Sequence, residues 1–271
     1  MLTKTLKVVV LFIAVFCSGA VNAGDLEDGQ AAYAKKNYAV ALVKFRQAAA
    51  QGLADAQYNL GRMYHSGEGV VQDHAEAVKW WKLAAAQGLA PAQNDLGVMY
   101  QNGRGIVQDH AEAVKWYGLA AAQGSSSAQL NLGAMYRNGR GVVQDYAEAV
   151  RWYKLAAAQG LAHAQLNLGL MYRNGLDVVQ DYAEAVKWWK LAAAQGLADA
   201  QYNLSVMYEN GQGVVQDYVR AHMWLNLAAA QGDADSVKNR DIVAKKMTTQ
   251  QIAAAQKLAR ECQARNYKNC D

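Results

Sequence analysis

Asparagine recurs at one position of a 36-residue repeat, with a single aspartate in its place. The residues are Asn59, Asp95, Asn131, Asn167 and Asn203. An amide side chain offers both a hydrogen-bond donor and an acceptor, so a ladder of amides can hold an extended peptide by its backbone without reading its sequence. The same amides could instead bond neighbouring helices and fix their stacking. Both interpretations stay open, and both place these residues on one surface.

Two nearby positions of the repeat differ from copy to copy and would supply selectivity to such a surface. One series is Tyr58, Asn94, Leu130, Leu166 and Tyr202, and the other is Arg62, Val98, Ala134, Leu170 and Val206. Together with the amide ladder we therefore select Tyr58, Tyr202 and Arg62 as candidate peptide-binding residues.

Residues that could catalyse reactions lack the spacing that catalysis needs. None of the seven serines is followed by lysine three residues later, and Gly-x-Ser-x-Gly is absent, so the signatures of serine hydrolases are missing. The repeated glutamates, such as Glu76, stand three residues before Lys or Arg, which is typical of weak ion pairs on a solvated helix face. The five histidines show no zinc-site spacing. We expect no catalytic residue, metal or cofactor.

The elements that position these residues follow from a second repeated motif, Ala-Ala-Ala-Gln-Gly. It occurs six times, with its glycines at Gly52, Gly88, Gly124, Gly160, Gly196 and Gly232. A fixed period in this range predicts one supersecondary unit copied in tandem, with each unit touching only its neighbours. The motif itself is expected to set the period and to close each unit, without binding anything.

One unit can be followed through residues 53–88. Apolar residues at helical spacing predict a first helix near residues 55–64, and Gly67 and Gly69 predict its end in left-handed backbone. Asp73 predicts the N-cap of a second helix, which Gly88 ends. Each unit is therefore a helical hairpin, and the copies begin at residues 53, 89, 125, 161 and 197.

A tryptophan recurs at one position in the second helix of each copy. These residues are Trp80, Trp116, Trp152, Trp188 and Trp224. A ring at the same place in each copy predicts a core between the repeats, in preference to an aromatic ladder for a ligand.

Residues 1–23 have the layout of a secretory signal peptide. Lys4 and Lys7 precede the apolar run 8–16, and small residues lead to a cleavage position after Ala23. Phe16 before Cys17 disfavours the alternative of a lipid anchor. We expect a periplasmic or secreted protein with no transmembrane segment in the mature chain. With 27 basic and 23 acidic residues, the charge gives no case for binding nucleic acid.

The two ends of the array differ from its middle. Residues 24–52 form a shorter first unit, residues 53–232 form five units of 36 residues, and residues 233–271 form a capping helix, beginning near Met247, and a tail. Cys262 and Cys270 are an even pair in a chain expected to be exported, which indicates a disulfide, although two free thiols with a redox role are the alternative.

The repeated residues resemble the Sel-1-like repeat family, a relative of the tetratricopeptide repeats. The pattern appears in the first copy as Ala56, Leu60, Gly61, Tyr64, Gly67, Gly69, Val70, Asp73, Ala77, Trp80 and Gly88. Five copies carry it, after a tetratricopeptide-like unit. Asp177 and Ser205 depart from it, and both are tolerable, since Asp accepts left-handed backbone and Ser is small.

This resemblance implies an all-α fold, a right-handed α-solenoid of antiparallel helix pairs whose first helices line the concave face. It implies a non-enzymatic scaffold of the bacterial cell envelope that binds a protein or extended peptide, with links to host-cell interaction or envelope signalling. Binding of peptidoglycan or of a cell-wall enzyme is the alternative. A β-lactamase-like enzyme is a third hypothesis, and it is disfavoured because the cysteine-rich subgroup associated with that activity has a disulfide in each repeat, whereas these repeats contain no cysteine.

Overall fold

The structure, a computed structural model, describes residues 23–270. The expected signal peptide lies outside the described residues except for Ala23. Fourteen helices and no strand occur in the described part of the chain. They are α1 (Ala23–Ala34), α2 (Tyr38–Ala50), α3 (Ala54–Ser66), α4 (His74–Ala86), α5 (Ala90–Asn102), α6 (His110–Ala122), α7 (Ser126–Asn138), α8 (Tyr146–Ala158), α9 (Ala162–Asn174), α10 (Tyr182–Ala193), α11 (Ala198–Asn210), α12 (Tyr218–Ala229), α13 (Ala234–Ala244) and α14 (Thr249–Ala264).

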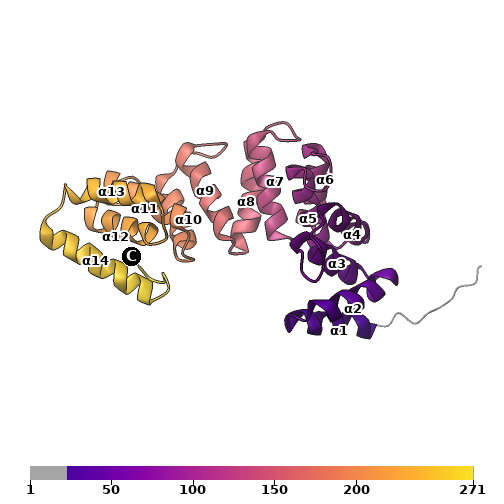
Figure 1. The fold of residues 1–271 in the computed structure, drawn as a ribbon. Helices are drawn as coiled ribbons and strands as arrows, with labels where there is room; N and C mark the ends of the chain where they lie inside the picture. Colours follow the sequence, from indigo (N-terminus) through magenta and orange to yellow (C-terminus); the bar gives the residue numbers. More distant parts are fainter. Residues whose placement is uncertain (1–22, 271) are drawn as a thin grey trace, which may run out of the picture.

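The helices form a stack of antiparallel pairs (Figure 1). In each copy the first helix (α3, α5, α7, α9 or α11) packs on the second helix that follows it, and the second helix packs on the first helix of the next copy. The expected all-α solenoid of helix pairs is confirmed. The buried residues divide into successive clusters along the stack, as expected of an array in which units contact only their neighbours.

Local sequence signals determine where the helices begin and end. The side chain of Asp73 accepts a 2.9 Å hydrogen bond from the backbone N–H of Glu76, and the corresponding aspartates cap α6, α8, α10 and α12. Gly67 ends α3 with a φ of 73°, and its N–H donates to the Met63 carbonyl. Only glycine adopts this backbone without strain.

A glycine inside each first helix makes room for a buried ring of the second helix. A Cβ added at Gly97 would lie 2.7 Å from the Tyr117 ring, and Gly61, Gly133 and Gly169 face rings in the same way. In the last copy Ser205 replaces the glycine and Leu225 replaces the ring. The N-terminal unit repeats the contact with Gly29 and Phe45. One close approach therefore sets the spacing within every pair except that of the last copy.

The predicted tryptophan series lies between the units, and it is not the most deeply buried series. Trp80 is half-buried and packs against the buried cluster of α1, α2 and α3. The next residue, Trp81, is only 3% exposed and occupies the position opposite the helix glycine.

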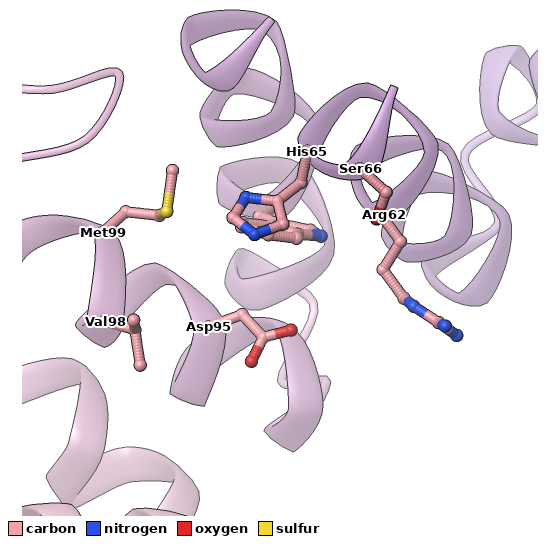
Figure 2. A pocket seen from close by; sticks show the side chains of 7 residues that line it. Arg62, His65, Ser66, Asp95, Val98 and Met99 are labelled. Atoms are coloured by element: carbon pink, nitrogen blue, oxygen red, sulfur yellow. The ribbon is translucent and has the colours of Figure 1, made fainter. Parts of the chain in front are cut away.

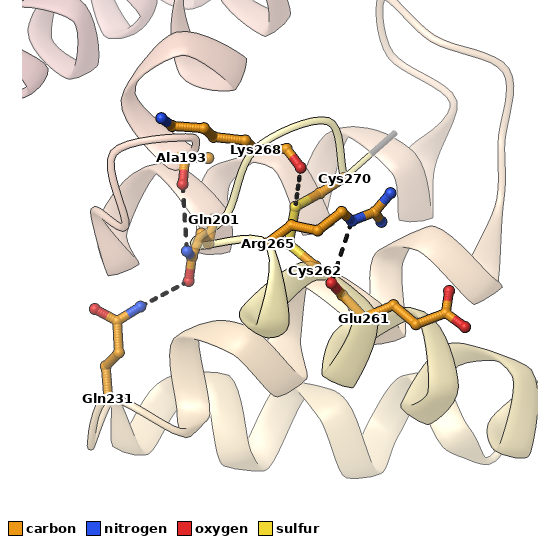
Figure 3. Close-up of a disulfide and its surroundings, with 8 residues drawn as sticks. All are labelled: Ala193, Gln201, Gln231, Glu261, Cys262, Arg265, Lys268 and Cys270. Atoms are coloured by element: carbon orange, nitrogen blue, oxygen red, sulfur yellow. Dashed lines mark hydrogen bonds between the residues drawn. A yellow bond between two sulfur atoms is a disulfide. The ribbon is translucent and has the colours of Figure 1, made fainter.

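A chain of buried glutamines connects the copies. The side chain of Gln201 donates to the carbonyl of Ala193 in the preceding copy and accepts a 2.9 Å hydrogen bond from Gln231 of its own copy (Figure 3). The same pattern occurs at Gln57, Gln93, Gln129 and Gln165, which accept from Gln87, Gln123, Gln159 and Gln195. Both the accepting carbonyl and the donating glutamine belong to the Ala-Ala-Ala-Gln-Gly motif. The motif thus links successive hairpins as well as closing them, which the sequence analysis did not foresee.

The C-terminal segment adds one helix to the expected cap. Helix α13 precedes the predicted helix α14, and α14 lies alongside α12 (Figure 1). Among the residues of α13 only Ser236 and Val243 are buried, so its apolar pattern is too sparse to predict a helix. Cys262 of α14 forms a disulfide with Cys270, with 5.1 Å between their Cα atoms (Figure 3). None of the helices described is long and apolar enough to cross a membrane.

We expect Gly97→Ala to lower the free energy of unfolding by about 1–2 kcal/mol, since the added methyl group overlaps a buried ring that has no room to move. Gly118→Ala is the matched control. Gly118 lies inside α6 with nothing near its missing Cβ, and alanine there should raise stability by about 0.5–1 kcal/mol. Urea denaturation of both variants measures the difference, and equal effects would contradict the role of Gly97.

Candidate functional site

The predicted binding residues lie on the first helices, on a surface made by the positions of Tyr58, Asn59, Arg62 and His65 in successive copies. We call this the first-helix surface. At its N-terminal end three copies are bonded together. The Tyr58 hydroxyl donates to Asp95 Oδ2 at 3.1 Å, the Asn94 amide donates to Asp95 Oδ1, and the Asn131 amide donates to Asn94 Oδ1 at 3.2 Å.

These bonds follow one rule, in which a residue at the Tyr58 position contacts the amide position of the next copy. The rule extends into the cap, where the Asn239 amide of α13 donates to the Tyr202 hydroxyl at 3.2 Å. Asn239 stands 36 residues after Asn203, so its spacing could have added it to the amide ladder. At these positions the ladder therefore joins neighbouring first helices by side-chain hydrogen bonds.

These hydrogen bonds between first helices are absent where the Tyr58 position holds leucine. Leu130 and Leu166 cannot bond the amides that follow them, so Asn167 accepts instead from Arg137, 3.1 Å from its Nη1. Asn59 and Asn203 make no side-chain hydrogen bond to another described residue. The interpretation of the ladder as a link between helices therefore applies to some copies and not to these two half-buried amides.

A pocket of about 160 Å³ opens on the first-helix surface between α3, α4 and α5 (Figure 2). Trp81 and Met99 form its apolar lining, and His65 lies against the Trp81 ring with 5.3 Å between the ring centroids. Asp95 and Arg62 supply charge. Its lining residues are Arg62, His65, Ser66, Trp81, Asp95, Val98 and Met99. Arg62 and Asp95 are among the binding residues selected from the sequence, whereas His65 is not.

Burial is the main cause of the pKa shifts of the ionisable groups in this pocket. It raises the pKa of Asp95 above its usual value, an effect that the hydrogen bonds from Asn94 and Tyr58 oppose. Burial, and then the nearby His74, lowers the pKa of His65. Burial and the adjacent Asp95 raise the pKa of Tyr58 to about 12. Arg62 is held in place by Tyr33 and Tyr58, whose ring centroids lie 5.6 and 6.0 Å from its Cζ.

The site contains no arrangement that would hold a metal. Across residues 23–270, no three His, Cys, Asp or Glu side chains are grouped so that they could bind an ion. Asp95 has both oxygens engaged by structural partners, and the glutamates of the second helices pair with Lys or Arg three residues on, as Glu76 does with Lys79 at 2.7 Å. The arrangement presents a polar surface into which a pocket with an apolar lining opens.

A solenoid of helix hairpins with a polar surface along its first helices defines a class of repeat scaffold, and the family within that class is identified by comparison. The Sel1 repeat model matches the chain five times, at residues 54–89, 90–125, 126–161, 162–197 and 198–233. The chain therefore belongs to the Sel1 repeat family. Each match begins one residue after the boundary that the sequence motif indicated.

Two solved structures are similar over most of the chain. A protective antigen present in uropathogenic Escherichia coli strains, with an SLR fold, is 37% identical over 92% of this chain, with a TM-score of 0.80. The chain spans about half of that antigen, 54% of its length. A Sel1 repeat protein from Oxalobacter formigenes is 34% identical over 81% of this chain and 87% of its own, with a TM-score of 0.76. No curated protein matches the chain.

The family membership gives the coarse function. This chain is a scaffold of the Sel1 repeat type, and such scaffolds typically mediate protein interactions and are generally non-catalytic.

The raised pKa of Asp95 predicts a pH-dependent effect of Asp95→Asn. A folded-state pKa above the unfolded value means that ionised Asp95 disfavours folding, fully above the folded pKa and not at all below the unfolded pKa. The free energy of unfolding of Asp95→Asn relative to the wild type should therefore increase as the pH rises from acid through this range. Urea denaturation at a series of pH values measures it. A difference that stays constant with pH would show that the carboxyl is not perturbed.

Proposed function

We propose that this protein is a non-enzymatic scaffold of the bacterial cell envelope that binds an extended segment of a partner protein along its first-helix surface. The pocket between α3, α4 and α5 is the observation that carries the proposal, because it joins an apolar floor to an arginine and a carboxylate on the surface where the copies differ. A side chain of the bound segment would enter it.

The positions that differ between copies support a role for this surface in selectivity. The glutamine chain and most of the glycine–ring contacts recur from copy to copy, so they build the stack. The first-helix surface instead changes along the stack, with Arg62, Val98, Ala134, Leu170 and Val206 at one position. Four side-chain hydrogen bonds join successive first helices directly, and neighbours in a curved stack are closest on its inner side. We therefore infer that this surface is concave.

The unbonded amides of Asn59 and Asn203 support recognition of an extended backbone, since an amide pairs with a peptide group through both its donor and its acceptor. An exported location is supported by the predicted signal peptide over residues 1–23 and by the similarity to a protective antigen, a kind of protein that the immune system must reach.

Selection of random peptides displayed on phage against the purified protein tests this proposal. We expect the enriched peptides to compete with one another and to bind Val98→Arg at least about tenfold more weakly, because the long cation fills the pocket. Leu119→Arg is the matched control. Leu119 is 51% exposed on the second helix α6, and binding should be unchanged there.

Circular dichroism and thermal unfolding establish that both variants fold. Peptides that bind Val98→Arg as well as the wild type would contradict a site on the first-helix surface. Sedimentation with purified peptidoglycan sacculi tests the alternative partner, and co-sedimentation that Val98→Arg abolishes would assign the surface to the cell wall instead.

A further inference from the structure

The third repeat contains a buried tyrosine whose hydroxyl has no hydrogen-bond partner. Tyr153 of α8 is 0% exposed, and its ring faces Gly133 as in the other copies. Its hydroxyl is buried and unpaired within the described structure. A buried polar group without a hydrogen bond loses its hydration and gains no partner in return, so such a group calls for an explanation.

The equivalent tyrosine of the second repeat shows what is missing. The Tyr117 hydroxyl donates to Gln101 Oε1 at 2.8 Å, from the last turn of α5. In the third repeat the position of Gln101 holds Arg137, and a guanidinium has donors only. In the first and fourth repeats the ring is a tryptophan, and Trp81 and Trp189 donate to backbone carbonyls at 3.2 and 3.1 Å.

The unpaired hydroxyl is peculiar to one copy, unlike the unpaired indole donors of the array. The indole N–H groups of Trp80, Trp116, Trp152, Trp188 and Trp224 are also unpaired, but they recur in every copy and belong to the repeated unit. Tyr153 became unpaired through a local exchange of an acceptor for a cation. The exchange places a guanidinium where Gln101 supplies an acceptor in the second repeat, and it leaves the Tyr153 hydroxyl without one.

Arg137 also lacks a carboxylate. Its Nη1 donates to Asn167 Oδ1 on the neighbouring helix α9, and no ion pair with an acidic side chain is present for it among residues 23–270. Arg137 thus bonds the Asn167 amide and acts through its charge on the Tyr153 hydroxyl. These three residues occupy the positions of His65, Trp81 and Asp95, which line the pocket of Figure 2 two copies earlier.

We propose that Tyr153, Arg137 and Asn167 form a binding site for a carboxylate, and that this carboxylate is an Asp or Glu side chain of the protein segment bound on the first-helix surface. The inference rests on the proposed function and names the chemistry of its partner. The carboxylate accepts from the Tyr153 hydroxyl and from Arg137, which turns from Asn167 to reach it. The freed amide of Asn167 then donates to the bound segment. Hydrogen bonds between charged groups are among the strongest in proteins.

The protonation states suit this role at neutral pH. Burial raises the pKa of Tyr153 to about 12, against the opposing charge of Arg137, so the hydroxyl keeps its proton. Arginine stays charged throughout. An acidic side chain is ionised over the same range, so the donors meet an acceptor with the opposite charge.

Calorimetric titration of the full-length protein with two probes tests the site. The first probe is hexaglutamate blocked at both ends, which presents only side-chain carboxylates, and the second is hexaglutamine with a free C-terminus, which presents only a terminal carboxylate. We expect the first to bind in a salt-dependent manner and at least about tenfold more tightly than the second. The reverse order would assign the site to a chain terminus and overturn the proposal as stated.

Arg137→Gln restores in the third repeat the pair found in the second, and should weaken hexaglutamate binding at least about fivefold without loss of thermal stability. Arg140→Gln, an exposed arginine in the adjacent loop, is the matched control and should change binding less than twofold. Equal weakening by both variants would show diffuse attraction of the acidic probe and would overturn the site.

Three further variants separate the contribution of the hydroxyl from that of the charge. Tyr153→Phe should weaken binding severalfold without destabilising the free protein, since it removes a donor that is unpaired, whereas Tyr117→Phe removes a made bond and should lower stability with no effect on binding. Gln101→Arg leaves Tyr117 unpaired beside a cation and should strengthen binding of the acidic probe by creating a second site. Unchanged hexaglutamate binding by Tyr153→Phe would overturn the role of the hydroxyl.

The outcome also separates this inference from the proposed function. Phage-selected peptides that depend on Val98 but bind Arg137→Gln as well as the wild type would leave the scaffold function standing and overturn the carboxylate site. The absence of any peptide sensitive to Val98→Arg would overturn the proposed function itself.

Discussion

The hydrogen bonds of the buried glutamines are the interaction on which the rest of this structure depends. Each glutamine of a first helix accepts from the Ala-Ala-Ala-Gln-Gly motif that closes its own hairpin and donates to the same motif of the hairpin before. A buried amide without partners is costly, so both bonds must form together. A shift of one hairpin against the next would break a bond in each. The glutamines therefore fix the register of one hairpin against the next, which the packing of small alanines alone would not fix.

This register makes the first-helix surface continuous. Tyr58 reaches Asp95, Asn131 reaches Asn94 and Asn239 reaches Tyr202 because each pair comes from successive first helices at the same height. With the stack held from inside, the surface positions are free to differ. The pocket beside His65, the arginine near Tyr153 and the amide of Asn203 are local variations on one repeated frame. The interior of the stack is therefore largely uniform from copy to copy, whereas the first-helix surface varies.

The fold was largely predictable from the sequence because its signals are local. The aspartate caps, the left-handed glycines and the apolar spacing all act within one helix turn, and the 36-residue period multiplies them. Contacts between elements were not predictable in this way. Gln129 bonds a residue 30 positions away, and Tyr58 bonds one 37 positions away, so neither pairing leaves a trace in local periodicity. Helix α13 was missed because it buries only two side chains. Of the site, the amide ladder was visible as a period, but which amides are bonded depends on the partner that faces each one.

A double-mutant cycle on Gln129 and Gln159 tests the central claim most directly. The Gln159 amide donates to Gln129 Oε1 at 2.9 Å. We expect the free energies of unfolding of Gln129→Ala, Gln159→Ala and the double variant to yield a coupling of about 0.5–1.5 kcal/mol. Gln129 and Gln195, which belong to different pairs, should be additive. Additive effects of Gln129→Ala and Gln159→Ala would contradict the claim that the glutamine chain holds the repeats in register.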